Sequence, residues 1–230
     1  MKSLRLLAYD KWYSKNIEKF LNLLDYSPTA SILDLGSGDG RFTVEIRKKT
    51  GSADITCVEI YEPFINKLKE LGFKVVKWDL NKFPYPFEDN SFDVITSNQV
   101  IEHLFFPVRF MLEVHRILKP NGYAVISTEN LASWDNILAL ILGYTPFSME
   151  FDNGVYKVGN PLSPHNCEIL ADSYPPHVRI FTYAGLKELC ELIGFHTEKI
   201  EGAGHLLGRF GEFIDKRHAR FVIIKIKKRG

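Results

Sequence analysis

The hydrophobic positions of the chain alternate between short runs typical of strands and longer runs with helical spacing. Residues 9–25 place Ile17, Phe20 and Leu24 at helical spacing, which predicts an amphipathic helix near the start. Strand and helix repeated in alternation predict an α/β fold, whose parallel sheet is covered by helices on both faces. Strand-like runs lie at 31–35, 54–59, 73–79, 92–98 and 123–128, and helical stretches at 39–50, 61–71 and 107–118.

The second half of the chain departs from this alternation. Residues 143–180 are rich in Pro, Gly, Asn, Tyr and His without a sustained period, so we expect an inserted cap over about 131–181. Two later strands without a clear helix between them predict an antiparallel pair at the sheet edge. No second core is evident, so one domain is expected over 1–230. After the cap come a helix (183–193), a strand (195–200), an irregular glycine-rich segment (202–211) and a last strand (219–227).

Composition and charge restrict the class of protein. Lys and Arg number 29 against 28 Asp and Glu, and this balance gives no general attraction to a nucleic-acid backbone. The most apolar run, 137–142, is far shorter than the ~20 residues that cross a bilayer, so no integral membrane segment is expected. Three scattered cysteines, Cys57, Cys167 and Cys190, favour a reducing compartment, and we expect a cytoplasmic protein.

A glycine-rich turn, Gly36-Ser37-Gly38-Asp39-Gly40, directly follows an apolar strand and precedes a helix. Its glycines are therefore expected at the carboxyl edge of the sheet, where open α/β folds bind ligands. Arg41 stands where the third glycine of the dinucleotide fingerprint belongs, and no Gly-Lys-Ser/Thr follows, which excludes a P-loop.

Acidic residues beside the turn narrow the choice of ligand. A carboxylate of Asp34 that pointed into the pocket would repel a pyrophosphate but suit an ammonium and a sulfonium. This charge favours S-adenosylmethionine (SAM) over a dinucleotide. Glu59, at the end of the next strand, can accept hydrogen bonds from ribose hydroxyls of either cofactor. Asp79 can accept a hydrogen bond from the adenine amino group, while Leu80 flanks the ring.

Residues 28–130 resemble the class I SAM-dependent methyltransferases, especially the small-molecule branch grouped as methyltransferase type 11. The resemblance implies a Rossmann-like, doubly wound sheet of seven strands in the order 3-2-1-4-5-7-6, with strand 7 antiparallel. That topology agrees with the edge pair expected above. The likeness is carried by Ile32-Leu33-Asp34-Leu35-Gly36-Ser37-Gly38-Asp39-Gly40, Val58-Glu59, Asp79, Phe92-Asp93-Val94-Ile95, Glu102-His103-Leu104 and Arg116-Ile117-Leu118-Lys119-Pro120-Asn121-Gly122.

The resemblance also implies which residues bind SAM, whose product is S-adenosylhomocysteine (SAH). The glycine turn, Asn98 and Gln99 would lie against the methionine part, and Ile60 against adenine. Gly40 could instead merely start a helix, and Asp79 could cap a turn. The full expected set is Asp34, Gly36, Ser37, Gly38, Gly40, Glu59, Ile60, Asp79, Leu80, Asn98 and Gln99.

Three histidines are candidates for catalysis. Methyl transfer needs a base only if the acceptor must lose a proton, and a neutral imidazole near pH 7 can take one up. His103, just after the fourth strand, is expected beside the methionine end of SAM, although it could equally shape the pocket or pack structurally. His165 and His177 of the expected cap could face the acceptor. The sequence predicts no metal ligand.

The acceptor is less well defined by the sequence. Asn98-Gln99-Val100-Ile101 replaces the Asn/Asp-Pro-Pro-Tyr of the DNA and protein-amide branch, which argues against base or amide nitrogens. The apolar and aromatic cap suits a small molecule, such as a sugar or a lipid-linked glycan intermediate. Residues 130–134 and 179–182 also resemble, loosely, methyltransferases of glycan synthesis.

Two other functions stay open, as does the oligomeric state. One is a Rossmann enzyme that uses NAD or another nucleoside cofactor. The other is a SAM-binding protein without catalysis, since an empty active site can keep the fold. A monomer and a homodimer are equally compatible with the sequence.

Overall fold

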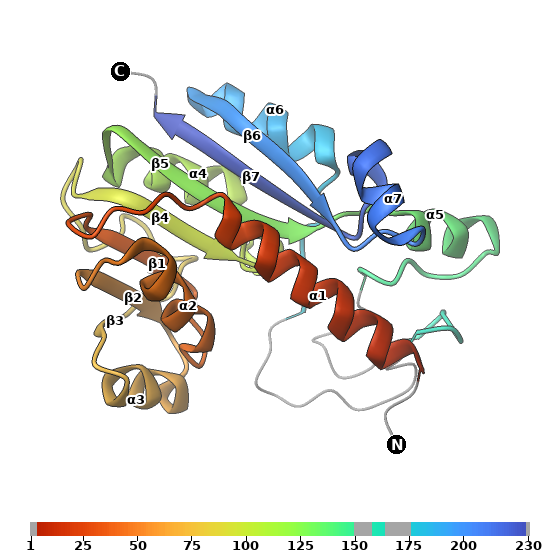
Figure 1. Cartoon of the computed structure of the whole chain (residues 1–230), viewed down its shortest axis with the longest axis horizontal. Coiled ribbons are helices and arrows are strands. Elements are labelled where there is room, and N and C mark those ends of the chain that lie inside the picture. Colours follow the sequence, from red (N-terminus) through yellow and green to blue (C-terminus); the bar gives the residue numbers. More distant parts are fainter. Residues whose placement is uncertain (1–3, 150–157, 164–175, 229–230) are drawn as a thin grey trace.

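A computed structural model describes residues 4–149, 158–163 and 176–228. They contain a seven-stranded sheet in the order β3-β2-β1-β4-β5-β7-β6 (Figure 1). This is the order that the resemblance implied, and the expected Rossmann-like fold is confirmed. The strands are β1 (Ile32–Leu35), β2 (Ile55–Glu59), β3 (Lys74–Lys77), β4 (Phe92–Asn98), β5 (Leu118–Glu129), β6 (Phe195–Ala203) and β7 (Phe221–Lys228).

Strand direction explains where a ligand can bind. Strands β1 to β5 are parallel, whereas β7 is antiparallel to both β5 and β6. The antiparallel pair expected at the edge is therefore confirmed. Strands β1 and β4 are neighbours, but the chain continues from β1 to β2 toward one edge of the sheet and from β4 to β5 toward the other edge. A crevice opens at the carboxyl ends of such a pair, and ligands of α/β sheets bind there.

Apolar side chains form two cores, one on each face of the sheet. Val222 and Ile224 belong to one core and Ile223 to the other, because successive side chains of a strand point to opposite faces. The first core includes α4 and α6, and the second includes α1, α2 and α3; α1 crosses one face in Figure 1. These helices are α1 (Leu4–Asn22), α2 (Arg41–Thr50), α3 (Glu62–Glu70), α4 (Pro107–Ile117) and α6 (Tyr183–Ile193).

The structure differs from the sequence prediction in the second half. The segment 202–211, predicted to be irregular, contains the start of helix α7 (Gly208–Ile214). Glycines obscured this helix because they are unfavourable in helix interiors. Gly211 is nevertheless required, since a Cβ there would lie 1.9 Å from Nδ1 of His205. Helix α5 (Trp134–Ile141) lies in the expected cap, whose extent stays a prediction because 150–157 and 164–175 lie outside the described residues.

The two cysteines among the described residues lie in the apolar core. Cys57 and Cys190 are buried, unbonded thiols, and burial raises the pKa of each to about 12. Such thiols are inert core groups, because the thiolate is the reactive form. Cys167 lies outside the described residues. Within the part of the chain that the structure describes, no helix is long and apolar enough to cross a membrane.

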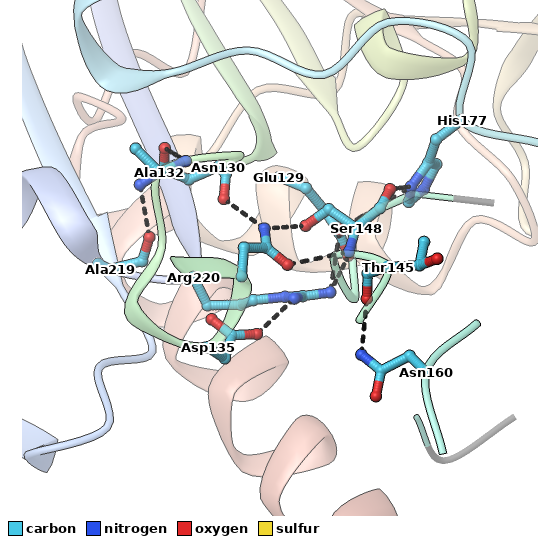
Figure 2. A network of polar contacts seen from close by, with 11 residues as sticks. Glu129, Asn130, Ala132, Asp135, Thr145, Ser148, Asn160, His177, Ala219 and Arg220 are labelled. Carbon is cyan, nitrogen blue, oxygen red and sulfur yellow. Dashed lines mark hydrogen bonds and ion pairs between the residues drawn. The ribbon is translucent and has the colours of Figure 1, made fainter. Parts of the chain in front are cut away.

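A buried arginine joins the end of β5 to α5 and β7. The guanidinium of Arg220 contacts both carboxylate oxygens of Glu129 at 3.0 Å and Oδ2 of Asp135 at 2.6 Å (Figure 2). Burial alone would lower the pKa of Arg220, and the two carboxylates more than offset that effect. The arginine therefore stays charged and fixes these three segments relative to one another.

The Arg220→Ala variant should lose about 3–5 kcal/mol of unfolding free energy, because Glu129 would stay buried without its guanidinium. Urea denaturation measures the loss. Lys74→Ala is the control: its pair with Asp54 is exposed and should contribute at most about 1 kcal/mol. Equal losses in the two variants would contradict a structural role for the buried network.

Candidate functional site

The glycine turn between β1 and α2 adopts a backbone that favours glycine. Gly36, Gly38 and Gly40 have φ angles of +75°, +54° and +80°. A Cβ on Gly36 would lie 2.5 Å from Cγ2 of Val100, so the turn packs closely against the segment that follows β4. A Cβ on Gly38 would meet no atom within 4 Å. A Cβ on Gly40 would lie 2.8 Å from side-chain atoms of Leu68 and Leu71. The turn is thus packed at both ends and open at Gly38, which leaves space for a ligand beside its backbone.

Glu59, the last residue of β2, holds the open part of the turn. Its Oε2 accepts a hydrogen bond from the amide of Gly38 at 2.8 Å, and its Oε1 accepts from the amides of Ile60 and Tyr61 at 2.8 and 3.0 Å. A carboxylate has about four acceptor positions, so one remains for a hydroxyl. The sequence analysis predicted that Glu59 binds a ribose. The structure places Glu59 at the carboxyl edge of the sheet, next to the glycine turn.

Asp34 does not point into the cleft, and the expected orientation of its side chain is wrong. It is 2% exposed, and its carboxylate accepts hydrogen bonds from the hydroxyls of Thr43 at 2.6 Å and Thr96 at 2.8 Å. Burial raises the pKa of Asp34, and these hydroxyls oppose that rise. Ser37 donates to the carbonyl of Asp34 at 2.9 Å. Asp34 therefore holds the turn from its buried side, because the hydroxyls of α2 and β4 supply hydrogen bonds in place of the water that burial removes.

The expected adenine side combines exposed and buried groups. Ile60 is 55% exposed, although it is a large apolar residue, and Leu80 is 9% exposed. Oδ1 of Asp79 accepts a hydrogen bond from the amide of Asn81 at 2.9 Å, which is the turn-capping arrangement considered above. Covering Ile60 with an aromatic ring would remove apolar surface from water. This surface fits the adenine of a nucleoside cofactor.

The expected methionine side involves a residue that the sequence analysis missed. Oδ1 of Asn98 accepts a hydrogen bond from Nδ2 of Asn16 at 2.8 Å, and Nε2 of Gln99 donates to Ser127 at 2.8 Å. Asn16 lies in α1 and is fully buried. Asn16 and Asn98 are far apart in the sequence, so their contact could not be predicted from local patterns. The only signal for Asn16 was a polar residue within an amphipathic helix. Gln99 has a φ of +57°, a strained backbone that is common at functional sites.

Two of the three candidate histidines come together just after β4. The rings of His103 and His177 lie 4.8 Å apart between centroids. His103 belongs to a short helix, η1 (Ile101–His103), and the amide of Val178 donates to the carbonyl of Glu102 at 2.8 Å. This backbone contact brings the last part of the expected cap against η1. His165 lies outside the described residues.

Glu102 is a site residue that the sequence analysis quoted only as part of the family likeness. It is fully buried, and its Oε2 accepts a hydrogen bond from Thr128 at 3.0 Å. Its Oε1 has no hydrogen-bond partner among the described residues. Burial raises the pKa of Glu102 to about 7, while the nearby His177 opposes that rise. The signal in the sequence was an acidic residue directly before a candidate histidine.

An apolar hollow of about 190 Å³ lies next to this cluster. Its lining consists of Leu131, Met149, His177, Val178 and Ile180. His177 belongs both to the cluster and to the hollow. A small molecule in the hollow would therefore contact the cluster through His177.

The part of the chain from 33 to 126 matches the family model of the type 11 methyltransferase domain. An uncharacterized methyltransferase of Schizosaccharomyces pombe is 32% identical over 116 residues, which cover 46% of this chain and 42% of that protein. The chain spans less than half the length of the first curated relatives that it matches.

Solved structures share the fold over nearly the whole chain. A SAM-dependent methyltransferase of Thermotoga maritima, described as a possible histamine N-methyltransferase, is 20% identical with a TM-score of 0.64, over 97% of this chain and 92% of that one. The [4+2]-cyclase SpnF is 15% identical with a TM-score of 0.56, over 93% and 80%. The family match, the strand order and the glycine turn agree: residues 33–126 form a methyltransferase domain similar to the type 11 family, within the fold of the class I SAM-dependent methyltransferases.

Proposed function

We propose that the protein transfers a methyl group from SAM to a hydroxyl of a small molecule, either a sugar or a lipid-linked glycan intermediate. The observation that carries this proposal is the open turn at Gly38, held by Glu59 and packed through Gly36 against the segment that leads to Glu102. The donor and acceptor regions are thereby neighbours at one edge of the sheet.

The residues of this edge fit SAM on several separate grounds. The backbone at Gly38 is open, Glu59 keeps an acceptor position for a ribose hydroxyl, and exposed Ile60 offers an apolar surface for adenine. Asp34 contributes by supporting the turn. We propose the methionine end beside Asn98 and Gln99, where α1 closes over the end of β4 through Asn16.

The chain's own residues have a limited task in this reaction. SAM supplies a methyl group on a positively charged sulfur, which leaves as neutral SAH when the acceptor oxygen takes the methyl group and releases its proton. The protein must align the two reactants and exclude water, because the methyl carbon is already activated. We propose that this proton is released beside Glu102, His103 and His177.

Apolar surface near the hollow supports an acceptor with a lipid part. Leu138 and Ile141 of α5 and Leu142 just after it are 46%, 73% and 59% exposed. Met149, which lines the hollow, follows Ser148, and Ser148 is hydrogen-bonded to Asn136 of α5. A lipid chain could cover these side chains while a sugar hydroxyl reached the cluster at His177. A free sugar would use the hollow alone.

An acceptor screen tests the reaction and separates it from the two alternatives. Purified protein is incubated with isotope-labelled SAM and with free sugars, nucleotide-linked sugars or lipid-linked sugars, and methylated product is identified by mass spectrometry. Methylation of a sugar hydroxyl supports the proposal. Binding of SAM without any methylated product favours a SAM-binding protein without methyl transfer. Binding of NAD in place of SAM favours a different Rossmann enzyme.

The Gly38→Ala variant should bind SAH at least about tenfold more weakly, because the added methyl group would occupy the open space beside the turn. Gly72→Ala is a matched control, since Gly72 also has a positive φ, +79°, and open space, but lies in the turn before β3. Each variant should lose about 1 kcal/mol of stability through backbone strain. Calorimetry with SAH measures affinity, and equal affinities in the two variants would refute this placement.

The Glu59→Gln variant should also bind SAH at least about tenfold more weakly, because it replaces one acceptor oxygen with an amide donor. Glu62→Gln is the control: Glu62 begins α3, pairs with Lys77 at the surface and should leave SAH affinity unchanged. The same calorimetric titration applies. Parent-like binding by Glu59→Gln would show that this carboxylate does not hold the ribose.

A further inference from the structure

Three side chains at the carboxyl edge of the sheet are close enough to share one ion. Glu102 and His103 come from η1, and His177 comes from the last part of the expected cap. One potential ligand atom from each lies within 4.8 Å of the others. The amides of Val178 and Arg179 donate to the carbonyl of Glu102 at 2.8 and 3.0 Å, so backbone contacts fix this arrangement.

Hydrogen bonds of the two imidazoles fix which nitrogen carries a lone pair. Nδ1 of His103 lies 3.1 Å from the carbonyl of Pro176, and Nδ1 of His177 lies 2.8 Å from the carbonyl of Ser148 (Figure 2 shows the latter). A carbonyl only accepts, so each Nδ1 must be the donor. The lone pair of each neutral ring then lies on Nε2. Metal-binding histidines are commonly oriented by such a bond from the other nitrogen.

The buried carboxylate supplies an independent indication of a ligand. Oε1 of Glu102 is fully buried and has no hydrogen-bond partner among the described residues, while Oε2 is bonded to Thr128. An unpaired buried oxygen is costly, and native proteins normally satisfy such atoms. A cation shared with the two histidines would satisfy Oε1. Glu129 lies 3.8 Å from Nδ1 of His177 and adds negative charge on the far side of that ring.

We propose that Glu102, His103 and His177 bind a divalent first-row transition-metal ion beside the acceptor hollow. Two imidazoles and one carboxylate are a donor set for such ions, and three protein ligands leave coordination positions open. Ligand atoms about 2.1 Å from a shared ion lie roughly 3.4 Å apart, so small side-chain rotations must close the present spacing. The sequence predicted no metal because one ligand is far from the other two along the chain.

The role of the ion rests on the proposed function. His177 lines the hollow, so open coordination positions would face an acceptor there. Such an ion lowers the pKa of a hydroxyl that it binds and fixes the position of the oxygen. The acceptor oxygen would then form its bond to the methyl carbon as the carbon–sulfur bond breaks, the electron pair would pass to sulfur, and the hydroxyl proton would pass to water. This arrangement selects acceptors with an oxygen that fits between the hollow and the ion.

Metal titration of the whole chain tests the site without any acceptor. Protein stripped with a chelator and desalted is titrated with Mn²⁺ by calorimetry and with Co²⁺ by visible absorbance. We expect one ion per chain, and at least roughly tenfold weaker binding in each of His103→Ala, His177→Ala and Glu102→Gln. His196→Ala is the control, because His196 is exposed on the edge strand β6 and should leave metal binding unchanged.

The outcomes separate failure of the metal site from failure of the proposed function. SAH binding is measured on the same samples, and thermal unfolding in chelator checks that each variant is folded. Glu102→Gln keeps an oxygen for the Thr128 hydroxyl and should fold. No metal bound by the parent, or equal binding by the parent and all three ligand variants, would overturn the metal site even if SAH bound normally. Metal binding that depends on the three residues would support it even if no acceptor were methylated.

Discussion

The acceptor side of the molecule depends on one backbone contact between distant segments. The amides of Val178 and Arg179 donate to the carbonyl of Glu102, and this places His177 against His103. Residues 176–180 are not in a helix or a strand, so their backbone groups need partners from elsewhere. The carbonyl of Glu102 supplies one because η1 is too short to use it internally. The same contact orients the lining of the hollow, since His177 and Val178 belong to both.

The buried Arg220 network connects the neighbourhood of His177 to the end of β5 and to the residues just before β7. Asn130, just after β5, donates through its backbone amide to the carbonyl of Arg220 and through its side chain to the carbonyl of Ala219. Arg220 in turn pairs with Glu129, whose carboxylate lies near His177. A change in β7 would therefore reach the acceptor side through charge and backbone contacts together. Stability and site geometry are linked here because a buried charge cannot lose its partner without a large cost.

Local patterns in the sequence were sufficient for most of the fold. Strand β4 and helices α4 and α6 were placed within a residue, since apolar periodicity and flanking Gly or Pro define such elements. The orientation of Asp34 was not predictable, because it depends on hydroxyls of Thr43 and Thr96 that come from other elements. Helix α7 was missed because the pocket that requires Gly211 is formed by His205 across a turn. The glycine turn could be placed because the residues next to it in the sequence define it. The hydrogen-bond partners of Asp34 could not be predicted, because they come from other elements.

The same distinction divides the site into two parts. The family match covers 33–126, which contains the glycine turn, Glu59, Glu102 and His103 but none of the residues that line the hollow, His177 included. The proposed cofactor groups therefore lie within the family match, and the proposed acceptor groups lie mainly outside it. Glu102 and His103 lie within the match yet face His177, which lies outside it. The proposed ion would require both parts to be folded and docked, so it would couple the proposed cofactor side to the proposed acceptor side.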